Sequence, residues 1–184
     1  MRAELAQDHR YAHTVRVARL ADRLAQRHGE DPARARLAGM LHDLARLCPA
    51  TTLVAECERR AMPIDDFEAR HPIVLHARLG AELARERFGV RDGAVLQAIA
   101  RHTVAAADMS RLDAILFLAD GLEPGRNFAQ REALETLAFA DLDGAMAALL
   151  RSTLTYLLGR QLEAAPQTLA ALHTYVLRRS PLSA

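Results

Sequence analysis

The 184-residue chain contains no tryptophan, and only 4% of its residues are aromatic. This scarcity argues against β-sandwiches and β-barrels, which favour aromatic and β-branched residues. Apolar residues nevertheless make up 51% of the chain and are mostly alanine and leucine, which favour closely packed helices. The expected fold class is therefore all-α, and the length suits one domain of ordinary size.

Cysteine, long apolar runs and excess charge are also scarce. Cys48 and Cys57 form no C-x-x-C motif and are too few for a disulfide framework, so we expect free buried thiols in a reducing compartment, the cytoplasm. No apolar run approaches the length of about 18 residues that a membrane span needs, and no signal peptide is expected. With 24 basic and 23 acidic side chains, the net charge of +1 predicts no general attraction for nucleic acid or an anionic membrane.

Against this apolar background, two adjacent polar residues stand out. His42 and Asp43 interrupt the apolar segment 37–45. Burying both costs free energy unless something compensates, and a divalent cation would do so. Matching imidazoles and carboxylates occur elsewhere in the chain, at His13, His76, His102 and Asp120. Buried ionisable clusters tend to be functional, so the six residues together predict a metal site.

Helix-capping signals place the first of these residues. A helix that ends at Gly29 would put His13 and Arg16 on one face. Asp31-Pro32 is a typical helix start, with an N-cap followed by proline at the first helical position. The helix that begins there is expected to carry the His42-Asp43 pair.

The remaining ligands fall on later helices. A long helix over about 68–89, with Pro72 near its first turn, is expected to contain His76 well inside it. His102 lies where the next apolar pattern stops, and a capping-box pattern starts the apolar helix that delivers Asp120. The sequence beyond is expected to form closing helices over about 132–137, 141–158 and 166–179.

These ligand types suggest a particular chemistry. Imidazole and carboxylate suit borderline divalent metals such as iron, manganese, zinc or cobalt. Two ions about 3.5–4 Å apart can lower the pKa of a shared water and neutralise charge on a phosphoryl group. We expect Asp43 to bridge such a pair. The first ion is assigned to His13, His42, Asp43 and Asp120, and the second to Asp43, His76 and His102.

A phosphate substrate would need further groups beside the metals. Arginine binds phosphate oxygens through two N–H groups and stays charged. Arg16, Arg46 and Arg126 each follow a predicted metal ligand closely, and Thr103 directly follows the fourth histidine of the set. We predict these four as substrate-binding residues, and Asp43 and Arg46 as catalytic residues.

The other four histidines, His9, His28, His71 and His173, are expected to be structural or surface residues. His71 is the competitor of His76, because both fall in one predicted segment. Only His76 is followed by the pattern x-x-x-Gly-Ala. We therefore expect His76 to be the ligand.

Five segments carry these residues in a fixed order: 9–18, 38–46, 75–81, 99–103 and 109–126. In this ordered set, which ends in Glu123-Pro124-Gly125-Arg126, the chain resembles the YqeK family of bacterial HD-domain hydrolases over about residues 9–128. The resemblance implies an all-helical HD-domain bundle that binds iron and is usually a homodimer. It also implies symmetric cleavage of diadenosine tetraphosphate, a dinucleoside polyphosphate, to two ADP. We expect a single HD domain over 1–184, with a metal-binding core at about 9–128 and closing helices at about 129–180.

Three positions depart from the family's usual pattern. Arg46 stands in place of a lysine, Val104-Ala105 in place of Thr-Gly, and Ala114 in place of another lysine. None is a predicted metal ligand, so the departures bear on the substrate rather than on the metal, which could also be manganese or cobalt. Two alternatives stay open: an HD-type phosphohydrolase of a mononucleotide or nucleoside triphosphate, and a nucleotide-sensing domain with weak turnover.

Overall fold

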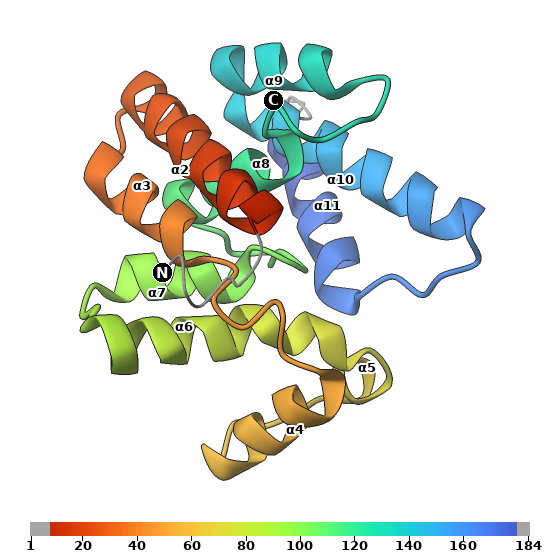
Figure 1. Ribbon diagram of the computed structural model, residues 1–184. Coiled ribbons are helices and arrows are strands. Elements are labelled where there is room, and N and C mark those ends of the chain that lie inside the picture. The colour runs from red at the N-terminus through yellow and green to blue at the C-terminus, as the bar shows by residue number, and fades with distance from the viewer. Residues whose placement is uncertain (1–7, 180–184) are drawn as a thin grey trace.

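The computed structural model describes residues 8–179, and all the regular elements within that range are helical (Figure 1). The all-α prediction is confirmed. The elements are α2 (Asp8–His28), α3 (Pro32–Leu41), α4 (Ala50–Arg59), α5 (Asp66–Arg70), the short 3₁₀ helix η1 (Pro72–Val74), α6 (Leu75–Phe88), α7 (Gly93–Arg101), α8 (Arg111–Leu122), α9 (Arg131–Ala140), α10 (Leu142–Gly159) and α11 (Pro166–Arg179).

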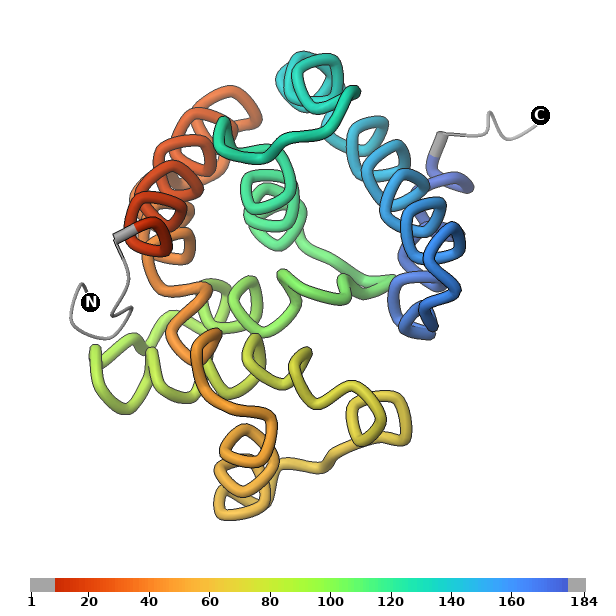
Figure 2. Tube along the Cα trace, turned by 45° about the vertical axis from the view of Figure 1, so that its right-hand side comes forward, coloured from red at the N-terminus to blue at the C-terminus, as the bar shows by residue number. Residues whose placement is uncertain are grey.

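Helix α8 occupies the centre of the molecule, surrounded by α2, α3, α7, α9 and α10 (Figures 1 and 2). Its sequence explains this position, because residues 112–119 are all buried. Its start is fixed by the predicted capping box, in which Ser110 and Asp113 each accept a hydrogen bond from the backbone N–H of the other. A helix that is apolar on nearly all sides must be enclosed by others, so α8 serves as the core against which the ligand-bearing helices pack.

Helices α2 and α3 form the most extensive helix pair and pack very closely at Gly39. A Cβ atom on Gly39 would lie 2.7 Å from Cα and 3.0 Å from the backbone nitrogen of Ala18. Glycine is therefore needed here for the close approach of two helix backbones. This approach brings His13 of α2 near the chain that follows α3.

We expect Gly39→Ala to lower the free energy of unfolding by about 1–3 kcal/mol, because the clash is with backbone atoms that cannot rotate away. Gly93→Ala is the matched control, since Gly93 is also helical and a Cβ atom added there would have nothing within 4 Å. Helix propensity favours alanine by up to about 1 kcal/mol at Gly39 and by less at Gly93, the first residue of α7, so a loss of stability in urea denaturation that only Gly39→Ala shows reports the clash. Equal stabilities for the two variants would contradict this account.

The prediction of one continuous helix over 68–89 is wrong, because the helix is interrupted just before Pro72. α5 ends at Arg70, His71 takes φ −126° and ψ 61°, and η1 follows. Proline lacks an N–H and disfavours helical geometry in the residue before it, which accounts for the break. His76 consequently lies in the first turn of α6, not well inside a helix, and Gly89 ends α6 in the left-handed region.

The prediction that the second helix carries His42 and Asp43 is also wrong. α3 ends at Leu41, His42 is its C-cap, and Asp43 lies in the turn that follows. The backbone there makes tighter hydrogen bonds, from the N–H of Leu44 to the carbonyl of Leu41 and from the N–H of Arg46 to the carbonyl of Asp43. His42 and Asp43 therefore follow the end of α3, where the last backbone carbonyl groups of the helix can accept hydrogen bonds from side chains.

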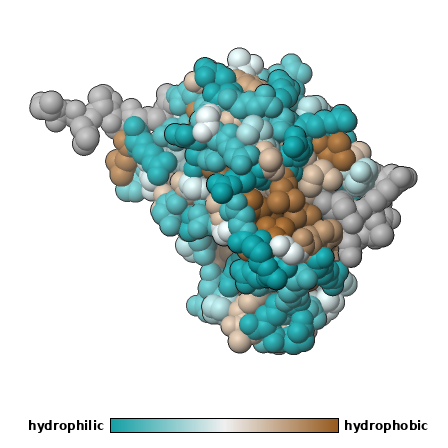
Figure 3. Space-filling model, turned by 90° about the vertical axis from the view of Figure 1, so that its left-hand side faces the viewer, coloured by the Kyte–Doolittle hydropathy of each residue, from teal (hydrophilic) through white to brown (hydrophobic). Residues whose placement is uncertain are grey.

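Within residues 8–179, no helix is both long and apolar enough to cross a bilayer. The face at the left of Figure 1 is mostly hydrophilic, with an apolar patch near its centre and smaller apolar areas towards its edges (Figure 3). Within the described residues, Cys48 and Cys57 form no disulfide. Cys57 is buried, as expected, whereas Cys48 is partly exposed, so the expectation of two buried thiols is wrong for Cys48.

Candidate metal centre

The six predicted ligands come together at one place beside α8. They arrive from α2, the turn after α3, the start of α6, the end of α7 and the last turns of α8. All of them are buried except Asp120, which is partly exposed. Their side-chain ligand atoms form three overlapping triads in which all atoms lie within 4.8 Å of one another: His13, His42 and Asp43; His42, His102 and Asp120; and Asp43, His76 and His102.

One half of the cluster is built on α2 and α8. Nε2 of His13 lies 3.2 Å from Oδ1 of Asp120 and 3.3 Å from Nε2 of His42. Oδ2 of Asp43 lies 3.8 Å from Nε2 of His13 and 3.6 Å from that of His42. Ligand atoms that each lie about 2.0–2.2 Å from a shared ion have separations in this range, so these four side chains fit a divalent cation.

The other half uses the second carboxylate oxygen of Asp43. Nε2 of His76 lies 3.3 Å from Nε2 of His102. Oδ1 of Asp43 lies 3.5 Å from His76 Nε2 and 3.9 Å from His102 Nε2. Oδ1 and Oδ2 of Asp43 therefore face different pairs of imidazoles, and such a carboxylate could contribute one oxygen to each of two neighbouring metal sites.

Three of the four imidazoles are oriented by backbone carbonyls at helix ends. Nδ1 of His42 donates to the carbonyl of Gly39 at 2.8 Å, and Nδ1 of His102 to that of Ile99 at 2.7 Å. Nδ1 of His76 donates to the carbonyl three residues earlier at 2.5 Å. Each bond fixes the ring and leaves Nε2 as the acceptor that points into the cluster, which is the usual support of a metal-binding histidine.

His13 lies in the middle of α2, where the backbone carbonyls are already paired, and it is supported by Glu123 instead. Its Nδ1 donates to Oε1 of Glu123 at 3.1 Å. Glu123 is 2% exposed, and it also accepts short hydrogen bonds from Arg16 and, at 2.6 Å, from the N–H of Gly125. These donors hold the pKa of Glu123 at about 2 although burial raises it, so the carboxylate stays charged.

The protonation states of His76 and His102 suit metal binding. Burial, together with the neighbouring imidazoles of His42 and His76, which disfavour a further positive charge, lowers the pKa of His102 to about 3. Burial also lowers the pKa of His76. Burial disfavours the charged form of His13 too, but the hydrogen bond and the charge of Asp120 outweigh it and raise the pKa of His13. His76 and His102 are therefore neutral at pH 7, the form that binds a metal without first losing a proton.

A pocket of about 330 Å³ opens onto the cluster, and Arg10, Arg46, Thr103 and Arg126 line it. Arg126 donates to Oδ1 of Asp120 at 2.6 Å. The hydroxyl of Thr103 lies 3.2 Å from Nε2 of both His76 and His102. The chain has no lysine, so guanidinium groups supply the permanent positive charge around this pocket.

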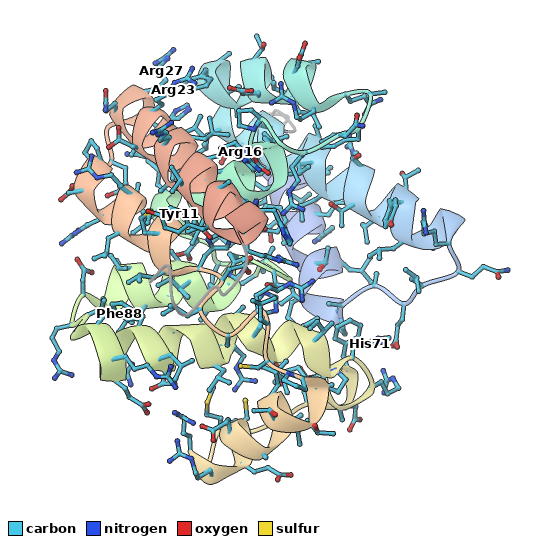
Figure 4. All side chains as sticks on the ribbon, in the orientation of Figure 1. Tyr11, Arg16, Arg23, Arg27, His71 and Phe88 are labelled. Carbon is cyan, nitrogen blue, oxygen red and sulfur yellow. The ribbon has the colours of Figure 1, made fainter. Side chains whose placement is uncertain are left out.

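Arg16 does not line that pocket and is instead bound to Glu123. Figure 4 shows it on the side of α2 that faces α8. A Cβ atom on Gly125 would overlap the Arg16 guanidinium, so glycine makes room for this contact. Arg16 therefore contacts the carboxylate that supports His13 and, unlike Arg46 and Arg126, does not reach the pocket.

Sequence reasoning missed two residues of the site, Glu123 and Arg10. Arg10 precedes His13 by one helical turn, lines the pocket and donates to Oδ2 of Asp43 at 3.3 Å. The i, i+3 spacing on α2 was a signal that could have identified it. His71, the competitor of His76, lies near α5 and contacts Glu163 at 2.9 Å, away from the cluster (Figure 4).

Comparisons with known proteins agree with this geometry. A model of the HD domain family matches residues 10–125. The symmetrical bis(5'-nucleosyl)-tetraphosphatase of Halalkalibacterium halodurans is 38% identical over 175 residues, which cover 94% of this chain and 91% of the relative. The protein of the same name from Bacillus subtilis is 33% identical over 161 residues, with 88% and 86% covered.

A solved structure is similar over nearly the whole chain. It is a predicted HD superfamily hydrolase involved in NAD metabolism from Clostridium acetobutylicum, with a TM-score of 0.93 and 31% identity. The match covers 97% of this chain and 94% of the other.

Proposed function

Because the chain belongs to the HD-domain family and, within it, to the symmetrical bis(5'-nucleosyl)-tetraphosphatases, we propose that it hydrolyses diadenosine tetraphosphate to two ADP. The observation that carries the proposal is the placement of Asp43. Its two carboxylate oxygens face separate pairs of imidazoles at the floor of a pocket lined by three arginines.

The residues of this site fit a pair of divalent cations. Four imidazoles with oriented Nε2 atoms and two carboxylates provide enough ligands for two ions, and their spacing suits both. Such a pair, when bound, supplies the charge that activates water and stabilises a phosphoryl group under attack. His13, His42, Asp43 and Asp120 would hold one ion, and Asp43, His76 and His102 the other.

The arginines would hold the polyphosphate in line with the metals. Arg10, Arg46 and Arg126 reach the pocket from different elements, so phosphates on both sides of the scissile bond can be bound at once. Arg10 and Arg126 contact Asp43 and Asp120, and their guanidinium groups thus lie where the charge of a bound substrate would accumulate. Thr103 can donate its hydroxyl to a phosphate oxygen beside His76 and His102.

The finer assignments are part of the same proposal. We propose iron as the native metal, a homodimer as the assembly, the cytoplasm as the location and a single HD domain over 1–184. The resemblance to the YqeK family implies the iron and the homodimer, and the match to the HD domain model over residues 10–125 supports the single domain.

Product analysis tests the function. The protein is loaded with Fe²⁺ under anaerobic conditions and incubated with diadenosine tetraphosphate, and the nucleotides are separated by chromatography. We expect ADP alone, with turnover lost on chelation and restored by Fe²⁺. AMP plus ATP would show asymmetric cleavage, and turnover of only mononucleotides or nucleoside triphosphates would favour the other HD-type activity. Either result would overturn the proposal.

A further inference from the structure

A second cavity adjoins the metal centre. It has a volume of about 520 Å³ and lies between one face of α10 and the turn that follows α8. We call it the side pocket, and the lining residues that matter here are Arg126, Asn127, Phe128, Ser152, Thr153 and Tyr156. Arg126 and Thr153 line both cavities, so the side pocket continues from the arginine-lined pocket of the metal centre.

The side pocket exposes aromatic surface in a chain that has little of it. The sequence contains eight aromatic residues, five Phe and three Tyr. Among the described residues, only three of these leave more than a third of their surface exposed, and Phe128 and Tyr156 are two of the three, at 36% and 56%. Phe88 is the other, at 40%. Exposed rings beside a cavity are suited to stacking against another flat ring.

Polar groups that match the edge of a base lie beside these rings. Asn127 offers an amide, which can donate to and accept from adenine at once, and Ser152 offers a hydroxyl. The hydroxyl of Thr153 donates to the carbonyl of Leu149 at 3.0 Å and keeps its lone pairs free to accept. Arg160 covers one face of the Tyr156 ring at 4.9 Å, which fixes the ring without filling the cavity.

From this arrangement we infer that the side pocket binds one nucleobase of the substrate, between Phe128 and Tyr156, while Arg126 holds the adjoining phosphates. The inference rests on the proposed function for the identity of the substrate. The two cavities differ in polarity, as the charged phosphates and the flat, neutral base of a nucleotide do. The pocket of the metal centre presents arginines and predicted metal ligands, and the side pocket, beyond the shared Arg126, presents aromatic rings and neutral hydrogen-bonding groups.

The test compares two ligands that share a diphosphate but differ in the nucleoside, ADP and inorganic pyrophosphate. Their binding to the Mn²⁺-loaded protein is measured by calorimetry for Phe128→Leu and Tyr156→Leu. We expect each variant to bind ADP about 5- to 100-fold more weakly, the usual value of one stacking contact, and pyrophosphate as tightly as the unmodified protein does. Asn127→Ala should also weaken ADP alone.

Phe88→Leu is the matched control, because Phe88 is similarly exposed but lies at the far end of α6 (Figure 4). It should leave the binding of both ligands unchanged. Unaltered ADP binding in the two pocket variants, an equal loss of pyrophosphate binding, or no ADP binding by the unmodified protein would overturn the inference. If the variants lose ADP selectively while diadenosine tetraphosphate is not hydrolysed, the base pocket stands and only the proposed activity fails.

Discussion

Asp43→Asn should reduce the turnover of diadenosine tetraphosphate by about a thousandfold, the equivalent of several kcal/mol of transition-state stabilisation. The substitution keeps the shape of the side chain but leaves one neutral carbonyl oxygen and an NH₂ group. Because Oδ1 and Oδ2 of Asp43 face different pairs of imidazoles, an amide cannot serve both. The bound metal should accordingly fall below two ions per chain.

The measurements are the steady-state rate of ADP formation and the metal content after dialysis, determined by elemental analysis. Asp108→Asn is the control, since the Asp108 side chain is 79% exposed and pairs only with Arg101 among the contacts described. It should retain both ions and full turnover. An Asp43→Asn protein with two ions and unaltered activity would eliminate the bridging role.

Glu123→Gln should weaken binding of the first metal about 10- to 100-fold, the usual effect of removing the group that supports a metal-binding histidine. Glu123 accepts from Nδ1 of His13 and thereby keeps Nε2 free and directed at Asp120. Glutamine can present its NH₂ group to His13, which favours the wrong tautomer, and it provides no charge for Arg16. Metal affinity, measured by titration with a competing chelator, is the direct test.

A second buried glutamate separates this effect from general destabilisation. Glu68 is 7% exposed and accepts two hydrogen bonds from Arg78, both at 2.6 Å, but it touches no metal ligand. Glu68→Gln should lower thermal stability as Glu123→Gln does and leave metal affinity unchanged. If both variants lost metal equally, the role of Glu123 would be structural and not specific to His13.

The sequence predicted those parts of the fold that depend on local chemistry. The N-cap at Asp31 and the capping box at Ser110 both start helices, and Gly89 ends one, as predicted. The failures came where two local preferences compete. The helical periodicity of the sequence continues through Pro72, but the missing N–H of proline ends the helix there. The periodicity likewise continues past Leu41, although α3 ends at that residue.

The candidate site shows the same division. Each predicted metal ligand was picked out as a polar residue in an apolar segment, and the structure brings all six side chains together. The support of His13 could not be recognised, because Glu123 lies 110 residues away in the chain and nothing local pairs them. The same holds for Arg16, since its partner is known only once α2 and α8 are packed together.

The six ligands belong to five segments spread between residues 13 and 120. An occupied centre would tie these segments together like a cross-link that forms only in the native state, and its contribution to stability would grow with the concentration of free metal. Metal shortage would therefore lower more than the rate per molecule. It would also raise the population of unfolded chains open to proteolysis, so that the amount of the enzyme and its specific activity would decline together.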